Sequence, residues 1–161
     1  MCSASGGLSR FNVAIALGSN LGDRRAHLEW ALGELRQFLH NAAISSIIET
    51  APVEVPDEQP PYLNAVVVGE TALSAPQVLA ELSRIERERG RTRLSFRASR
   101  TLDLDLILHG DTVVSTDQLV VPHPRFRDRE FVLGPLAEIA PAMVDPVTGL
   151  TAGELLQKLR T

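Results

Sequence analysis

The chain has 161 residues, 44% of them hydrophobic and 22% charged, a size and composition typical of one folded domain. Its net charge of −4 argues against a general nucleic-acid-binding protein, and no apolar run reaches the ~18 residues that a membrane span requires. The single cysteine, Cys2, excludes an internal disulfide bond and fits a cytoplasmic protein. Residues 1–10 are rich in Ser and Gly, so we expect a loose leader followed by one domain over residues 11–161.

The first half of the chain contains short apolar runs and one helical pattern. Residues 12–17 predict a buried strand that is closed by a turn at residues 18–20. A helix is expected from about Asp23, since apolar residues then recur every three or four positions, at Leu28, Ala31, Leu32, Leu35 and Leu39. Strands are expected at 44–50 and 62–71, separated by a proline-rich loop at 51–61 that lacks the donors for regular structure.

The second half begins with a helix that starts at Pro76 and stops at Gly90. In the strand expected at 101–108, leucines alternate with Asp103 and Asp105, as in a strand with one buried face. A short strand at 113–114, a helix at 129–139 and a last helix after Thr151 follow. The order strand, helix, strand, strand, helix, strand predicts an α+β fold with a ferredoxin-like βαββαβ core, an antiparallel sheet with helices, plus C-terminal helices.

Two features of the second half indicate chemistry. Seven of the 16 basic residues, all arginines, lie between residues 84 and 100, and guanidinium groups suit bidentate contacts with phosphate. Asp103 and Asp105 project from one strand face roughly 7 Å apart, a spacing that can hold one or two Mg²⁺ ions shared with substrate phosphates. The ordinary alternatives are a solvated basic helix with its loop and a solvent-facing acidic strand. Aspartates are disfavoured in strands, and their place directly after the arginines favours phosphoryl transfer.

The stretch RTLDLD at residues 100–105 resembles the signature of the 6-hydroxymethyl-7,8-dihydropterin pyrophosphokinase family. Other family motifs occur in the expected order over residues 12–141: ALGSNLGD at 16–23, YLN at 62–64, Arg91 after Gly90, VPHPR at 121–125, and Arg129 and Phe131 before PL at 135–136. The resemblance implies a folate-biosynthesis enzyme with two Mg²⁺ ions. Such an enzyme transfers diphosphate from ATP to the hydroxyl of 6-hydroxymethyl-7,8-dihydropterin and releases AMP.

The resemblance also implies roles for single residues. Asp103 and Asp105 would bind the metal ions, and Asp105 is also a candidate acceptor for the hydroxyl proton. The charge of the transferred group would be neutralised by Arg91 and Arg100, and ATP would be bound by Glu86, Arg93, Arg100, His123 and Arg129. The pterin would lie between Tyr62 and Phe131, with its edge contacted by Thr50, Ala51, Val53 and Asn64. Glu86 is equally explained as an ion-pair partner on its helix, and the two aromatic rings by core packing.

The loop before the signature departs from the family pattern, because it is shorter and contains no tryptophan. Phe96 is therefore the candidate aromatic residue for a lid over the substrates. Two rival functions remain, a catalytically weakened ligand-binding paralogue and a metal-dependent phosphodiesterase that uses the same two aspartates without a pterin. The expected partners are the small molecules ATP and a reduced pterin, with the chain acting as a monomer that binds neither nucleic acid nor a membrane.

Overall fold

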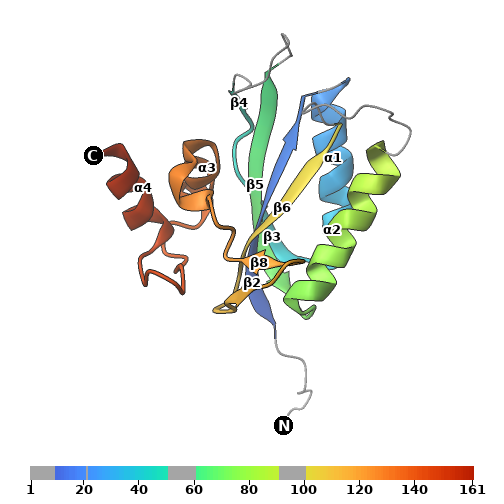
Figure 1. Cartoon of the computed structure of the whole chain (residues 1–161). Coiled ribbons are helices and arrows are strands. Elements are labelled where there is room, and N and C mark those ends of the chain that lie inside the picture. The colour runs from blue at the N-terminus through green and yellow to red at the C-terminus, as the bar shows by residue number, and fades with distance from the viewer. Residues whose placement is uncertain (1–9, 21, 51–60, 91–100) are drawn as a thin grey trace.

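The structure, a computed structural model, describes residues 10–20, 22–50, 61–90 and 101–161. An antiparallel sheet lies between two layers of helices (Figure 1). Its strands are β2 (Phe11–Ser19), β3 (His40–Ile44), β4 (Ile48–Thr50), β5 (Tyr62–Thr71) and β6 (Asp103–His109). The strand order is β3-β5-β2-β6, and β4 pairs with β5 beyond the end of β3. With the first strand in the centre of the sheet, this is the predicted ferredoxin-like arrangement, which the structure confirms.

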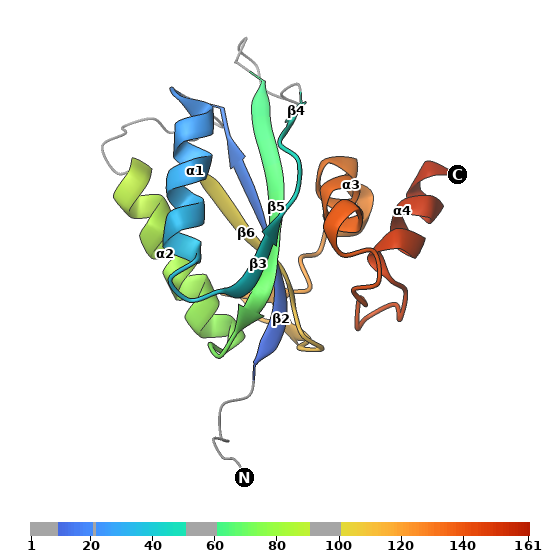
Figure 2. The same ribbon diagram turned by 180° about the vertical axis from the view of Figure 1, so that it is seen from behind.

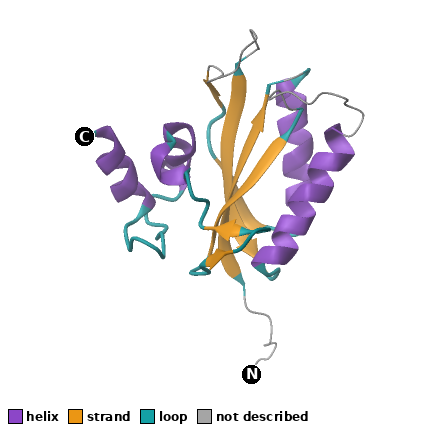
Figure 3. Ribbon diagram, viewed as in Figure 1, coloured by secondary structure: helices purple, strands orange, loops and turns teal. Residues whose placement is uncertain are grey.

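The two faces of the sheet carry different helices. One face is covered by α1 (Arg24–Leu35) and α2 (Ala75–Gly90), as Figure 2 shows from behind. On the other face lies α3 (Glu130–Ile139), and α4 (Ala152–Arg160) packs against α3 (Figure 3). The connection from β6 to α3 contains β7 (Val114–Ser115), β8 (Val120–Val121) and the short 3-10 helix η1 (Phe126–Asp128). None of the described helices has both the length and the hydropathy to cross a membrane.

Strand β2 is buried on both faces, which explains its continuous apolar sequence. Val13, Ile15 and Leu17 belong to the core beneath α1 and α2, whereas Ala14 belongs to the core beneath α3 and α4. The residues of β2 that face α3 are therefore small, and Gly18 continues that row toward the end of the strand. Small side chains in this row leave space above the sheet.

The predicted boundaries were wrong at four strands. The strand predicted at 101–108 is β6, which runs over Asp103–His109. Gly18 and Ser19 do not form a turn, because Gly18 pairs with Asn64 on β5 and with Asp103 on β6 and so continues β2. The strand predicted at 44–50 is two strands, and β3 begins earlier, at His40. The short strand predicted at 113–114 is β7, one residue later.

A set of polar contacts causes the break between β3 and β4. The Ser45 hydroxyl accepts a hydrogen bond from the Val66 amide, at 2.9 Å. The amide and the hydroxyl of Ser46 both donate to the Glu138 carboxylate on α3, at 3.1 and 2.8 Å. This contact fastens the far end of α3 to the sheet. Since Glu138 lies 92 residues away in the chain, no local pattern predicts the break.

Two helices start where the sequence predicted, after Asp23 and after Thr151, and both starts are capped by side chains. Asp23 accepts a hydrogen bond from the Ala26 amide at the start of α1, and Thr151 and Glu154 form a reciprocal capping box at the start of α4. Helix α1 ends at Leu35, so Leu39 lies beyond the helix, although it is buried as predicted. Arg89, in the last turn of α2, donates to His27 Nδ1 of α1 at 2.7 Å and lies over the Trp30 ring. These contacts hold the C-terminal end of α2 beside α1.

Candidate active site

A cavity of about 440 Å³ lies between the sheet and α3. It is lined by seven of the residues that the sequence predicted for the site: Thr50, Tyr62, Asn64, Asp103, Asp105, Arg129 and Phe131. They come from β4, β5, β6 and the start of α3, elements that are distant in sequence. Arg91, Arg93, Phe96, Arg100, Ala51 and Val53, also predicted for the site, lie outside the described residues.

The register of the sheet determines how polar groups are arranged in the cavity. Gly18, on the central strand, pairs with Asp103 on one side and with Asn64 on the other. Since neighbouring strands are ~4.8 Å apart, Asp103 and Asn64 are separated by roughly 10 Å across a glycine without a side chain. A Cβ atom at position 18 would lie 3.3 Å from Asn64 Oδ1 and 3.6 Å from Tyr62 Cδ1. Glycine at this position therefore keeps the floor of the cavity open.

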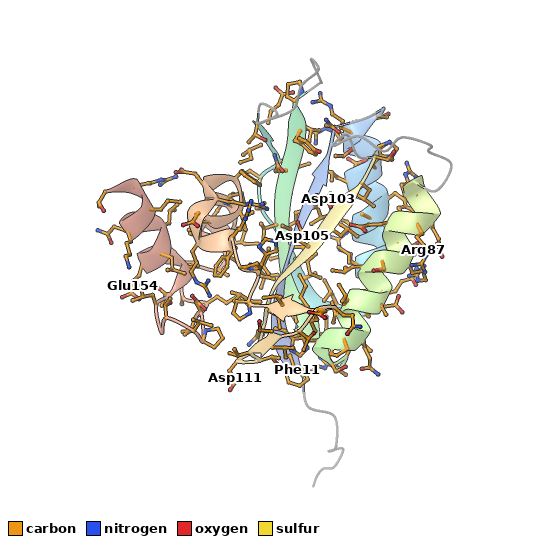
Figure 4. The ribbon with its side chains drawn as sticks, in the orientation of Figure 1. Phe11, Arg87, Asp103, Asp105, Asp111 and Glu154 are labelled. Carbon is orange, nitrogen blue, oxygen red and sulfur yellow. The ribbon has the colours of Figure 1, made fainter. Side chains whose placement is uncertain are left out.

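Asp103 and Asp105 lie on the cavity side of β6, and the leucines between and beside them lie in the core beneath α1 and α2. Both aspartates are half-buried, so the alternative of a solvent-facing acidic strand does not describe them. Figure 4 shows them along the same half of β6, with Asp111 beyond the other end of the strand. The described residues contain no cluster of three or more carboxylate, imidazole or thiol groups. Mg²⁺ is suited by two carboxylates from the protein when phosphate oxygens and water provide its remaining ligands.

The opposite side of the cavity is formed by β4, β5 and α3. The Asn64 amide donates to Thr50 Oγ1 at 2.7 Å, a contact that orients both side chains. Asn64 is only 8% exposed, and its remaining hydrogen-bonding groups are available to a ligand in the cavity. Tyr62 and Phe131 both line the cavity and are only half-buried, which core packing alone does not explain. The Arg129 guanidinium lies over the Phe131 ring, 5.6 Å from the ring centroid, in a cation–π contact.

His123 has a defined protonation state. Its Nδ1 atom accepts a hydrogen bond from the Arg125 amide at 3.1 Å, so Nδ1 carries no proton. Burial lowers the pKa of His123 below its ordinary value, and the charges of Arg129 and Arg125 lower it further against the opposing effect of Asp103. The ring is therefore neutral at neutral pH and presents Nε2–H as a donor. A donor of this kind suits the predicted contact with an oxygen of ATP.

Glu86, on α2, contacts the backbone of β6. Its carboxylate accepts a hydrogen bond from the Leu104 amide at 2.7 Å, at the residue between the two aspartates. The ion pairs of the neighbouring Arg84 extend instead to Glu81, Glu88 and Glu34. Glu86 therefore supports the strand that carries Asp103 and Asp105, a role that neither sequence-based interpretation included.

Sequence reasoning missed Arg125, which lines the cavity together with Arg129. Neither guanidinium forms an ion pair with a carboxylate in the described part of the chain, although two aspartates line the same cavity. Two guanidinium groups that have no carboxylate partner among the described residues, and that line the same cavity, favour an anionic ligand. The available signal was the motif VPHPR itself, in which Arg125 comes two residues after His123.

A second feature that sequence reasoning missed is a buried ion pair close to the cavity. Asp145 is fully buried and accepts two hydrogen bonds from Arg127, at 2.6 Å from Nε and 3.1 Å from Nη2. It also accepts from the Val147 amide at 3.0 Å and from the Thr148 hydroxyl at 2.8 Å. Burial by itself raises the pKa of Asp145, but these hydrogen bonds outweigh it and hold the pKa below its ordinary value.

The lowered pKa of Asp145 predicts a pH-dependent contribution to stability. Such a carboxylate stabilises the fold fully above its unfolded pKa of ~3.9, and this contribution is lost as the pH falls through the folded value. At neutral pH, Asp145→Asn should lower the free energy of unfolding by about 3 kcal/mol. Thermal melts of both proteins from pH 7 downward should show the difference in Tm shrinking below about pH 4. A difference that is constant with pH would contradict the assignment.

Comparison with known proteins identifies relatives over most of the chain. Residues 14–141 match the family described as 7,8-dihydro-6-hydroxymethylpterin-pyrophosphokinase (HPPK). A 2-amino-4-hydroxy-6-hydroxymethyldihydropteridine pyrophosphokinase of Haemophilus influenzae is 44% identical over 134 residues, which cover 82% of this chain and 83% of the relative. The protein of the same name from Bacillus subtilis is 47% identical over 133 residues, covering 80% and 78%.

Longer proteins contain a region similar to this chain. The mitochondrial folate synthesis bifunctional protein of Pisum sativum is 41% identical over 137 residues, which cover 84% of this chain but only 26% of the relative. Among solved structures, Plasmodium falciparum HPPK-DHPS has a TM-score of 0.74 at 16% identity and covers 96% of this chain and 46% of that chain. At this low identity the structural likeness supports the fold alone.

Proposed function

Because the chain belongs to the 7,8-dihydro-6-hydroxymethylpterin-pyrophosphokinase family, it is a diphosphotransferase of folate biosynthesis, and we propose that the cavity between the sheet and α3 is its active site. The enzyme transfers diphosphate from ATP to the hydroxyl of 6-hydroxymethyl-7,8-dihydropterin, which yields AMP and the pterin diphosphate. The observation that supports the site is that seven predicted residues from separate elements line one cavity.

Asp103 and Asp105 are the residues that would hold Mg²⁺, since both are half-buried carboxylates on the same face of β6. When bound, Mg²⁺ supplies positive charge to the phosphates of ATP and to the leaving group. The protein provides two carboxylates here, which leaves the remaining ligand positions to phosphate oxygens and water. Arg125 and Arg129 line the cavity and provide donors for the phosphates or the ribose. His123 does not line it, but it lies close enough to both arginines for their charges to lower its pKa, and its Nε2–H is a further donor.

The remaining cavity residues suit a flat aminopyrimidinone ring. Tyr62 and Phe131 provide aromatic faces, and the Asn64 amide with the Thr50 hydroxyl provides both donors and acceptors for the edge of the ring. Gly18 leaves the space between Asn64 and Asp103 free, so that a pterin held at Asn64 extends its hydroxymethyl group toward the aspartates. Binding in this orientation places the hydroxyl group beside the bound ATP, so that the transfer becomes effectively unimolecular.

In the proposed reaction, the hydroxymethyl oxygen forms a bond to the β-phosphorus of ATP, and the bond from that phosphorus to the α,β-bridging oxygen breaks. AMP leaves with the electron pair of the broken bond. The hydroxyl proton must be accepted by a base, and Asp105 is the candidate among the cavity residues. Catalysis then consists mainly of positioning and charge neutralisation, which is typical of phosphoryl transfer.

The decisive experiment measures AMP release from ATP and Mg²⁺ with and without 6-hydroxymethyl-7,8-dihydropterin. We expect AMP and pterin diphosphate in equal amounts, no AMP without the pterin, and no turnover in excess EDTA. AMP formed without the pterin would instead support the phosphodiesterase. Binding of both substrates without turnover would support the weakened paralogue, for which the comparisons provide no support.

The substrates are small molecules, and we further propose that the chain acts as a monomer in the cytoplasm. The support for that compartment is the single cysteine, while the bifunctional relative of Pisum sativum is named as mitochondrial. Sedimentation at micromolar concentration tests the monomer, since a species of twice the mass would contradict it.

Gly18→Ala should weaken pterin binding selectively. The added methyl group would approach Asn64 Oδ1 to 3.3 Å, and overpacking of this kind typically costs about 1–3 kcal/mol. The pterin KM should rise roughly tenfold while the ATP KM changes less than twofold. Gly33→Ala on the exposed side of α1 is the matched control, because a Cβ atom there meets nothing within 4 Å. Equal pterin KM values for the two variants would show that Gly18 does not limit the cavity.

A further inference from the structure

An ion pair joins the C-terminal part of the chain to the segment that carries two cavity-lining arginines. The family match ends at residue 141, whereas Asp145 lies beyond it and bonds to Arg127 of η1. The two ion-pair residues are separated by 18 positions in the chain and join the segment before α4 to the segment before α3. Nothing in the family match accounts for this contact.

The three arginines around η1 alternate in direction. Arg125 and Arg129 line the cavity, while Arg127 between them bonds to Asp145 and lies over the Phe126 ring, 4.9 Å from its centroid. Three cations within five residues repel one another, and Asp145 neutralises the middle one. The bidentate contact also fixes the plane of the Arg127 guanidinium, which a single point charge does not.

The segment that carries Arg125 and Arg129 has few other side-chain anchors. Arg125 precedes η1 and Arg129 precedes α3, and neither helix start has a side-chain capping hydrogen bond. Phe126 is fully buried and holds the segment against the core by apolar contacts, which do not define the direction of its arginines. The Arg129 guanidinium lies over the Phe131 ring, and the contact of Arg127 with Asp145 fixes the backbone between Arg125 and Arg129.

Asp145 itself lies in a rigid turn. Its amide donates to the Leu150 carbonyl and its carbonyl accepts from the Gly149 amide, both at 2.8 Å. The Ala152 amide donates to the Met143 carbonyl at 2.8 Å, which closes the turn at the start of α4. Because α4 packs against α3, this turn is a fixed support for Arg127.

We propose that the Arg127–Asp145 ion pair is a positioning element of the active site, which holds Arg125 and Arg129 where they contact the phosphates of ATP. The proposal rests on the proposed function of the cavity. Arg127 and Asp145 are positioning residues, since neither lines the cavity, and Arg125 is a further phosphate-binding residue. The C-terminal segment thereby contributes to catalysis without contacting a substrate.

A double-mutant cycle tests the proposal. In the otherwise unchanged protein, Asp145→Asn should lower kcat/KM for ATP roughly tenfold, since small displacements of positioning groups have effects of this size or larger. In an Arg125→Ala/Arg129→Ala background the same substitution should change kcat/KM less than twofold, because the groups it positions are absent. All assays run well below the Tm of each variant. Arg127→Gln repeats the cycle from the less buried partner of the pair, in case Asp145→Asn does not fold.

The control is Arg160→Gln, which removes the exposed ion pair between Arg160 and Glu130 that also joins α4 to α3. It should leave kcat/KM for ATP unchanged. An equal effect of Asp145→Asn in both backgrounds would overturn the positioning role and leave a structural one. If Arg125→Ala/Arg129→Ala itself retains normal kcat/KM, the placement of ATP in the cavity is wrong, and the positioning proposal fails with it. That result is distinguishable, because it appears before Asp145 is changed.

Discussion

Replacing Asp103 or Asp105 by asparagine is expected to lower kcat by roughly 10²–10³ each, the loss that commonly follows removal of one well-placed group that stabilises charge in the transition state. Asparagine keeps the shape of the side chain but removes the charge that Mg²⁺ and the phosphates require. Both residues line the cavity and lie outside the two hydrophobic cores. Their replacement should therefore leave the Tm within a few degrees of the original value.

The matched control is Asp111→Asn, an exposed aspartate beyond the other end of β6 (Figure 4). It changes the net charge by the same amount and should leave kcat unchanged. The measurement is AMP release at saturating ATP and pterin over a range of Mg²⁺ concentrations. If Asp103→Asn or Asp105→Asn retains more than a tenth of the original kcat at every Mg²⁺ concentration, the aspartates are not the metal ligands.

Asn64→Ala is expected to raise the pterin KM by roughly 10- to 100-fold with little change in the KM for ATP. The amide is nearly buried and bonded to Thr50, so its remaining groups are already oriented when the ligand arrives. Removing it leaves the edge of a bound pterin without a hydrogen-bond partner, which costs about 1–3 kcal/mol. The loss concerns binding in the ground state and the transition state alike, so it should appear in KM more than in kcat.

Asn12→Ala is the control for Asn64→Ala. Asn12 is an exposed residue of β2 at the opposite end of the same sheet, and its loss should leave both KM values unchanged. Initial rates at varied pterin and fixed saturating ATP provide the comparison. A rise in the ATP KM that equals the rise in the pterin KM would place Asn64 with the nucleotide instead.

Local sequence patterns determined the element types and the two aspartates of the proposed site. The alternation around Asp103 and Asp105 predicted both the strand and the face on which the carboxylates lie. Helix starts were expected near Asp23 and after Thr151, and the structure has caps at both residues. These predictions are correct because helix and strand periodicity and helix capping depend on residues no more than four positions apart. The family resemblance added five further residues that line the same cavity, including Asn64 and Phe131.

Only the tertiary structure decided where one element supports another. The break between β3 and β4 depends on Glu138, and the direction of Arg127 depends on Asp145. Glu86 bonds to the backbone of Leu104 across two elements. Each contact joins residues 18 or more positions apart, and each acceptor is a carboxylate whose partner the sequence did not indicate. No local sequence pattern predicts a hydrogen bond between distant segments, because such a bond depends on how the helices pack against the sheet.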